Sequence, residues 1–238
     1  SSFYQRAYDQ VIHDVAMQNL PVIMCVDRAG CVGADGETHQ GLFDMAFFRL
    51  VPNLVIMAPK DFKELEEMLE FAVNIEKPVV IRYPRGGEDK NIKFEIHNKI
   101  ELGKSEILKE FDNDKIEALE NQNLEDVEIN ENKEKPKNVS VIAIGKMVPR
   151  AMKIAKKEEN NGNNVCVVNS RFLKPFDRTN ILEILKKSDK VITIEDGTII
   201  NGLGTIIKEI IAEENFENIE IETEISNLQE LVNEGNQQ

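Results

Sequence analysis

The 238-residue chain has no tryptophan and only three cysteines. Cys25, Cys31 and Cys166 show neither the CxxC nor the Cys/His spacing of a metal site, and their odd number does not suggest a disulfide framework. Reduced thiols are typical of the cytoplasm, where we expect this protein to reside. No apolar run approaches the roughly 20 residues that a membrane span requires, so we expect no membrane partner.

Positive charge is also scarce. Lysine and arginine number 29 against 43 aspartates and glutamates, which gives a formal net charge of −14. Because nucleic-acid phosphates require a basic face, this balance excludes nucleic acid as an expected partner. An anionic substrate must then be held by a local cluster of cations. The 41% of hydrophobic residues is sufficient for packed cores, and the length suits two domains.

The first part of the chain has the pattern of an α/β domain, which we place at residues 1–88. Apolar residues recurring every four positions predict a helix from Phe3 to about Asn19. Asp61 with Glu64 is typical of a capped helix start. Short apolar runs predict buried strands at 21–26, 54–57 and 78–83. Strands and helices that alternate in this way favour parallel pairing.

Residues 89–138 are interpreted as a linker, a strand and an acidic insertion. The segment from Lys109 to Lys137 has few large apolar groups, so we expect it to be disordered. Order should resume in a second α/β domain at 139–238. Its predicted strands lie at 139–145, 165–168 and 190–194, with helices at 149–159 and 180–187. The glycine-rich turn 197–204 lacks the Gly-Lys-Ser/Thr ending of a phosphate loop, so close helix packing explains it better. Mostly parallel sheets are expected in both domains.

A glycine-rich loop follows the first predicted strand and carries polar side chains at 27–41. Open α/β sheets bind ligands where strands end, and glycines let the backbone approach a ligand closely. Arg28 supplies a cation, Asp35 a carboxylate and His39 an imidazole. The plainer alternative is a solvated turn, because Gly and Asp are also the commonest turn residues.

A second polar group follows the third predicted strand, at Arg82 and Arg85. Arginine binds phosphate in a bidentate manner, so Arg28 and Arg85 are candidates for one phosphorylated ligand. Successive strand residues point to opposite faces, so Arg82 points away from Arg85 and is expected to be structural. A surface salt bridge is the alternative role for Arg85.

The motifs together resemble one enzyme family. Residues 6–10, 27–30, 33–41, 55–59 and 82–86 read RAYDQ, DRAG, GADGETHQG, VIMAP and RYPRG. In this order they are similar to the 1-deoxy-D-xylulose-5-phosphate synthase family, and the second domain resembles a transketolase C-terminal domain. The resemblance implies a partial pyrimidine-binding domain followed by that C-terminal domain. It also implies condensation of pyruvate with glyceraldehyde 3-phosphate, with loss of CO₂, toward isoprenoid, thiamine and pyridoxal precursors.

Site roles follow from the same resemblance. Phe3 would stack on the aminopyrimidine of thiamine diphosphate, with Arg6 on the same wall. Arg28 and Arg85 would hold the sugar phosphate. His39 would face the reacting carbons together with Asp35, and an imidazole there can move protons while a neighbouring carboxylate orients it.

We expect no metal ligand in this chain. In the family, the diphosphate- and Mg²⁺-binding domain and an activating glutamate lie upstream of the position of Ser1. We therefore expect a C-terminal fragment that is inactive alone and belongs to a homodimer. The alternatives are part of a transketolase or of a 2-oxo-acid dehydrogenase β subunit, and a non-catalytic binding module of the same fold.

Overall fold

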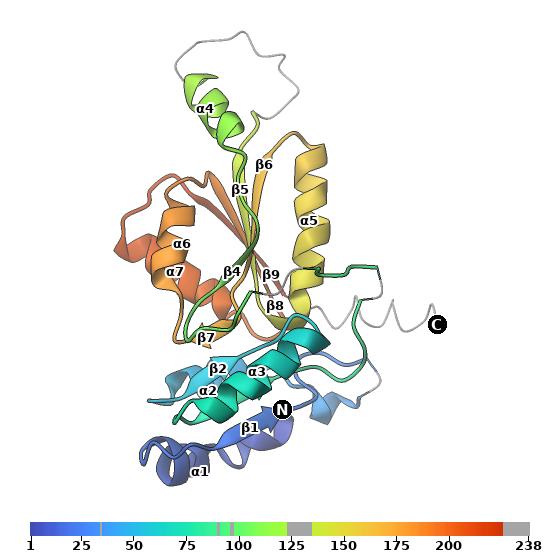
Figure 1. The fold of residues 1–238 in the computed structure, drawn as a ribbon, viewed down its shortest axis with the longest axis vertical. Helices are drawn as coiled ribbons and strands as arrows, with labels where there is room; N and C mark the ends of the chain where they lie inside the picture. The colour runs from blue at the N-terminus through green and yellow to red at the C-terminus, as the bar shows by residue number, and fades with distance from the viewer. Residues whose placement is uncertain (34, 90, 96–97, 123–134, 226–238) are drawn as a thin grey trace.

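The computed structural model describes residues 1–33, 35–89, 91–95, 98–122 and 135–225. Two α/β units are stacked along the long axis of the molecule (Figure 1). The first contains the N-terminal helices and a four-stranded sheet, and the second contains a five-stranded sheet with a helical layer on each face. The α/β class and the mostly parallel pairing expected from the sequence are confirmed.

The first sheet contains the three strands predicted for residues 1–88 and a fourth strand that was not predicted. Its order is β1-β3-β2-β7. β1 and β2 both pair in parallel with β3, whereas β7 pairs antiparallel with β2. β1 is an edge strand, and Met17, Leu20 and Val22 near it are exposed. The strands span Ile23–Val26 (β1), Val55–Met57 (β2), Val79–Arg82 (β3) and Phe172–Lys174 (β7).

Three helical segments replace the single helix predicted from Phe3 to Asn19. A 3₁₀ turn at Ser2–Gln5 is followed by α1 (Tyr8–Gln10) and a π-helix at Val11–Ala16. α2 (Asp44–Leu50) was not predicted. The predicted cap is confirmed, because the Asp61 side chain accepts a hydrogen bond from the Glu64 amide (2.7 Å) at the start of α3 (Phe62–Asn74).

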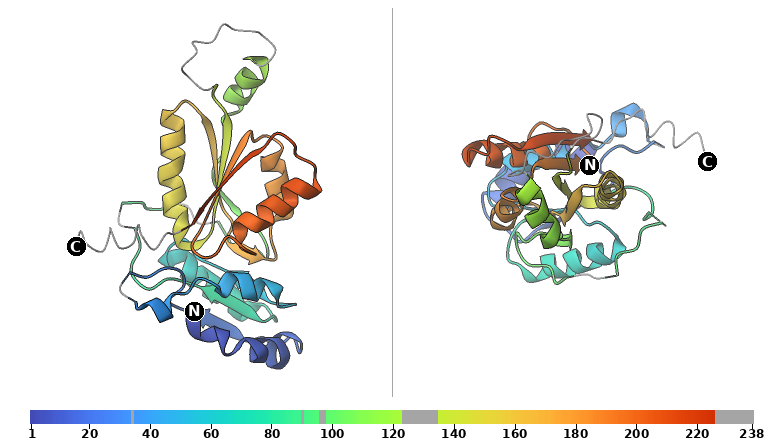
Figure 2. Two further views of the ribbon diagram at one scale, coloured as in Figure 1. Left: turned by 180° about the vertical axis from the view of Figure 1, so that it is seen from behind. Right: turned by 90° about the horizontal axis from the view of Figure 1, so that it is seen from above.

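The second sheet has the order β4-β6-β5-β8-β9, and all its pairings are parallel except β4 with β6. α5 covers one face, and α6 and α7 cover the other (Figure 2). The strands are Glu106–Lys109 (β4), Asn138–Ala143 (β5), Asn164–Asn169 (β6), Lys190–Glu195 (β8) and Glu220–Ile225 (β9), and the helices are Val148–Asn160 (α5), Arg178–Leu185 (α6) and Leu203–Glu213 (α7).

The glycine-rich turn before α7 is a packing feature, as expected. The Glu195 carboxylate accepts hydrogen bonds from the backbone amides of Leu203 and Gly204, at 2.8 and 2.9 Å. These amides lie at the helix N-terminus, where a phosphate would otherwise bind. A Cβ on Gly202 would lie 2.0 Å from a Glu195 oxygen, so only glycine fits there.

The acidic insertion is not disordered over its first part. Residues 113–122 form α4 (Asn113–Gln122), which projects from the end of the second unit in Figure 1. The expectation of disorder from Lys109 onward is therefore wrong for this stretch. Residues 123–134 lie outside the described part of the chain. No helix among the described residues is long and apolar enough to cross a membrane.

The two units share one core. A single apolar cluster contains Val26 and Phe48 of the first unit together with Ile142 and Ile207 of the second. β7 also places a segment of the second half of the sequence in the first sheet, where the Ala58 amide donates to the Arg171 carbonyl (3.0 Å). This shared packing fixes how the loops of the first unit meet the second.

Candidate active site

The two candidate arginines follow adjacent strands. β1 and β3 pair in parallel with Val26 opposite Arg82, so both strands end at the same edge of the sheet. Arg28 lies two residues beyond β1, and Arg85 lies three residues beyond β3. The predicted placement of both at neighbouring strand ends is therefore confirmed. Arg82 is buried and bonds Asp44 through its Nε (2.9 and 3.0 Å), which is the structural role expected of it.

Arg28 and Arg85 converge on one carboxylate. The Nη1 atoms of Arg28 and Arg85 lie 3.2 Å and 2.6 Å from the same oxygen, Oδ1 of Asp35. The Asp35 side chain is only 3% exposed, whereas both arginine side chains are about half exposed, at 48% and 47%. One carboxylate offsets only one of two guanidinium charges, so a positive charge faces solvent. A ligand anion placed here would meet both guanidiniums.

Asp35 also carries an unsatisfied buried oxygen. Its Oδ2 has no hydrogen-bond partner within the described part of the chain. Leaving a buried acceptor unpaired costs about 1–3 kcal/mol. The burial of this atom also keeps it from solvent, so the contacts of Asp35 at the site are those that its Oδ1 makes with the two guanidiniums.

His39 lies next to the aromatic wall rather than on Asp35. Its ring packs edge-on against Phe3, with centroids 5.3 Å apart, and its Nδ1 lies 2.9 Å from the Thr38 hydroxyl. No hydrogen bond joins His39 to Asp35, although both residues are described. Both arginines hold the Asp35 carboxylate in this structure, and Thr38 and Phe3 contact the imidazole ring, so an orienting role of Asp35 toward His39 stays a prediction.

Phe3 and Arg6 form the wall predicted to meet the cofactor. The Phe3 ring is 59% exposed, and the Arg6 guanidinium lies over it, 5.7 Å from the centroid. An exposed ring of this kind can stack on a planar heterocycle. The residues present therefore fit the pyrimidine end of thiamine diphosphate.

The side chain of Gln40 holds the loop and was missed by the sequence analysis. Its Oε1 accepts from the Val32 amide (2.8 Å), and its Nε2 donates to the carbonyls of Val32 (3.0 Å) and Asp35 (3.1 Å). A glutamine that closes a loop on itself has no sequence signature beyond its polarity.

The second unit braces the same loop. Asp196 Oδ1 accepts from the Cys31 amide (3.2 Å), and Lys146 bonds the Cys31 carbonyl (3.1 Å) and the other Asp196 oxygen (2.6 Å). A Cβ on Gly30 would lie 1.5 Å from that carboxylate, and Gly30 has φ +78°. Only glycine permits this approach. Arg28 also has a positive φ, of 50°, a strained conformation that often marks functional positions.

The described residues contain no cluster of three or more histidine, cysteine, aspartate or glutamate side chains that could hold a metal ion. A Mg²⁺ ion therefore does not fit a site built from this part of the chain alone.

Comparison with known proteins decides the family. The transketolase pyrimidine binding domain matches residues 1–87, and the transketolase C-terminal domain matches residues 128–238. The chain belongs to the transketolase family. A solved structure titled "Split gene transketolase, inactive beta4 tetramer" superposes with a TM-score of 0.76 at 27% identity, covering 98% of this chain and 68% of that one.

Within the transketolase family, curated relatives point to one activity. The 1-deoxy-D-xylulose-5-phosphate synthases of Caldanaerobacter subterraneus and Natranaerobius thermophilus are 45% and 43% identical over 89% of this chain. That of Halothermothrix orenii is 42% identical over 93%. The chain spans only about 30% of the length of these relatives. These names favour the synthase over the other thiamine diphosphate enzymes of the family.

Proposed function

We propose that this chain is the pyrimidine-binding and C-terminal part of a 1-deoxy-D-xylulose-5-phosphate synthase, which condenses pyruvate with glyceraldehyde 3-phosphate and releases CO₂. The observation that carries the proposal is the convergence of Arg28 and Arg85 on Asp35. Two half-exposed guanidiniums on a chain of net charge −14 are suited to a phosphorylated acceptor.

Each residue of the candidate site then has a separate role in substrate binding or catalysis. Arg28 and Arg85 bind the acceptor phosphate through charge-assisted hydrogen bonds. Asp35 faces the reacting carbons beside these arginines and holds both guanidiniums through its Oδ1. His39, held by Thr38 and Phe3, donates or accepts a proton at the oxygen of the reacting carbonyl.

Thiamine diphosphate supplies the thiazolium carbon chemistry when bound, and the protein contributes binding and orientation. Phe3 and Arg6 would contact its pyrimidine end. We propose that a further polypeptide segment binds the diphosphate and Mg²⁺, since the described residues offer no metal site. The edge position of β1 and the exposed Met17, Leu20 and Val22 support contact with such a segment. We also propose a homodimer in the complete enzyme and a cytoplasmic location, which the free thiols support.

A chimera tests the activity. This chain replaces the matching region of the Caldanaerobacter synthase, and product formation is measured at varied concentrations of each substrate. Each arginine contact is worth about 1.5–3 kcal/mol, so Arg28→Ala or Arg85→Ala should raise the KM for glyceraldehyde 3-phosphate by about ten- to a hundredfold. The KM for pyruvate should change much less. The control is Arg178→Ala, an exposed arginine paired with Glu213 and Glu214, which should leave both constants unchanged.

Two results would contradict the proposal. A folded chimera that makes no product would contradict the proposed activity. An equal rise in the KM of both substrates in the arginine variants would contradict the assignment of Arg28 and Arg85 to the acceptor phosphate. Calorimetric titration of the isolated chain with thiamine diphosphate and Mg²⁺ adds a check. We expect no appreciable binding, and micromolar affinity would show that the cofactor site lies elsewhere.

A further inference from the structure

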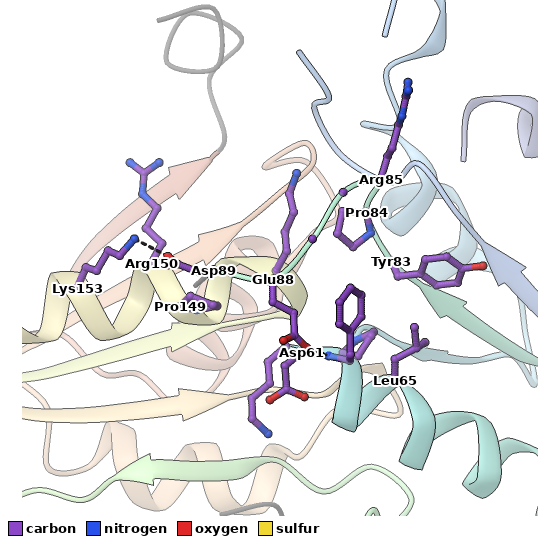
Figure 3. A pocket seen from close by; sticks show the side chains of 16 residues that line it. Asp61, Leu65, Tyr83, Pro84, Arg85, Glu88, Asp89, Pro149, Arg150 and Lys153 are labelled. Atoms are coloured by element: carbon purple, nitrogen blue, oxygen red, sulfur yellow. Dashed lines mark hydrogen bonds and ion pairs between the residues drawn. The ribbon is translucent and has the colours of Figure 1, made fainter. Parts of the chain in front are cut away.

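A cavity of about 260 Å³ lies where the linker leaves β3 and crosses between the two units. The start of α3 forms one wall, and the start of α5 forms another (Figure 3). Arg85 reaches its rim, but the guanidinium points away from the α3 and α5 residues, toward Asp35. The cavity therefore adjoins the candidate active site: Arg85 and Lys146 belong to both, and the residues of α3 and of α5 beyond Lys146 form the rest of its lining.

Three cations line the α5 side of this cavity. Lys146, Arg150 and Lys153 are spaced four and three residues apart, so they lie along one face of the helical segment. Each has an acidic partner in this structure, and the pair of Lys153 with Asp89 (2.5 Å) is partly exposed, at 57% for the lysine side chain and 22% for the aspartate side chain. Exposed ion pairs contribute little stability, so a ligand anion can replace Asp89 at low cost.

The opposite wall is apolar. Phe62, which is 58% exposed, lines it together with Leu65, Tyr83 and Pro84, and Pro149 of α5 also lines the cavity. A half-exposed phenylalanine in a cavity rimmed by cations favours a ligand with both a flat apolar part and an anionic part.

The linker already places anions in the cavity. The Glu88 carboxylate accepts a hydrogen bond from the backbone amide of Phe62, one of the unpaired donors at the start of α3, while Asp89 contacts Lys153. Both residues follow Gly86 and Gly87, where an added Cβ would meet no atom within 4 Å. Because glycine tolerates many backbone conformations, the two carboxylates can leave these positions. They occupy the places that a ligand phosphate would take.

We propose that this cavity is a second ligand site, for a small phosphate ester with a flat apolar body. Its phosphate takes over the contacts that Asp89 makes with Lys153 and bonds Arg150, and its apolar body packs between Phe62 and Pro149. Since only two glycines separate Arg85 from Glu88, a ligand that displaces the linker carboxylates acts next to the acceptor-binding arginine. This placement suits a regulatory ligand.

Phenyl phosphate is the probe, and its binding to the full chain is measured by isothermal titration calorimetry. We expect the unchanged chain to bind phenyl phosphate. The double variant Arg150→Gln/Lys153→Gln should bind it at least about tenfold more weakly, because two charge-assisted contacts are lost. The matched control is Lys186→Gln, an exposed lysine paired with Glu183 on a distant helix, which should leave the affinity unchanged. Inorganic phosphate and phenol, the two halves of the probe, should each bind more weakly than phenyl phosphate.

A variant that is expected to tighten binding tests whether the ligand displaces the linker carboxylates. Asp89→Asn should tighten phenyl phosphate binding several-fold, whereas Glu183→Gln, with the same change of net charge, should not. Arg28→Ala separates this site from the proposed active site and should leave the affinity unchanged. The proposal is overturned if the chain does not bind the probe, if Arg28→Ala abolishes binding, or if the double variant binds as tightly as Lys186→Gln. Circular dichroism spectra confirm that each variant is folded.

Discussion

Arg171 allows the sharpest stability prediction because it joins the two units through buried charges. Its Nε lies 2.7 Å from Glu64 on α3, and its Nη2 lies 2.8 Å from Glu106 on β4. Lys60 contacts the same two carboxylates, at 3.1 and 2.7 Å. All four side chains are at most 2% exposed. Two cations and two anions leave this cluster neutral.

Replacing Arg171 with methionine keeps much of the volume but leaves the buried cluster with one uncompensated negative charge. Breaking a buried pair in this way typically costs about 3–5 kcal/mol of unfolding free energy. The variant also loses hydrogen bonds to the carbonyls of Asn98 (2.9 Å) and Lys99 (3.4 Å). Urea unfolding followed by circular dichroism measures the loss. Arg178→Met, which removes an exposed arginine with two acidic partners, should cost no more than about 1 kcal/mol.

The pH profile distinguishes lost charge pairing from lost packing. Burial alone would raise the pKa of Glu106, but the hydrogen bond from Lys60 and the positive charges of Arg171 and Lys60 outweigh it and lower that pKa below 4.5. A carboxyl with a lowered folded-state pKa stabilises the fold above its unfolded pKa, and this contribution is lost as the pH falls through the folded value. Without Arg171 the pKa of Glu106 rises, so the folded variant takes up the Glu106 proton more readily and loses less stability in acid; the stability deficit of the variant should therefore shrink as the pH falls through the pKa of an unfolded glutamate. Equal losses in the two arginine variants, or unchanged pH profiles, would refute this reasoning.

Two further predictions concern His39 and the cysteines. In the chimeric enzyme, His39→Ala should lower kcat by roughly 10² to 10⁴ if the imidazole moves protons, with little change in the unfolding midpoint; near-normal turnover across the pH range would leave His39 with a packing role only. Iodoacetamide, with modified sites mapped by mass spectrometry, should label the exposed Cys25 first in the folded chain. Burial raises the pKa of Cys31 and raises that of Cys166 to about 12, so these thiols should react only after unfolding in urea, and early labelling of Cys166 would contradict its burial.

The strands of both sheets were predictable where an apolar run was bounded by polar residues or turn signals, as at 21–26 and 190–194. β7 was not, because it has only three residues and its partner β2 lies more than a hundred positions earlier in the chain. α4 was missed for a different reason. Low apolar content predicts little burial, but glutamate, lysine, alanine and leucine still favour helix locally. Composition therefore gave the exposure of this segment and not its conformation.

The candidate site shows the same limit. That Arg28 and Arg85 end adjacent strands follows from strand order, and parallel pairing of β1 with β3 confirms it. The partner of Asp35 could not be derived in this way. Asp35 lies four residues before His39 in the sequence, but only the fold brings the guanidiniums of Arg28 and Arg85 to its carboxylate. Asp196 and Lys146 brace the loop from more than a hundred positions away. Pairing with both arginines makes Asp35 the counter-ion of Arg28 and Arg85 in this structure. Under the proposed function, an acceptor phosphate shares or replaces the Asp35 contact, and Asp35 keeps the two arginines aligned before the substrate arrives.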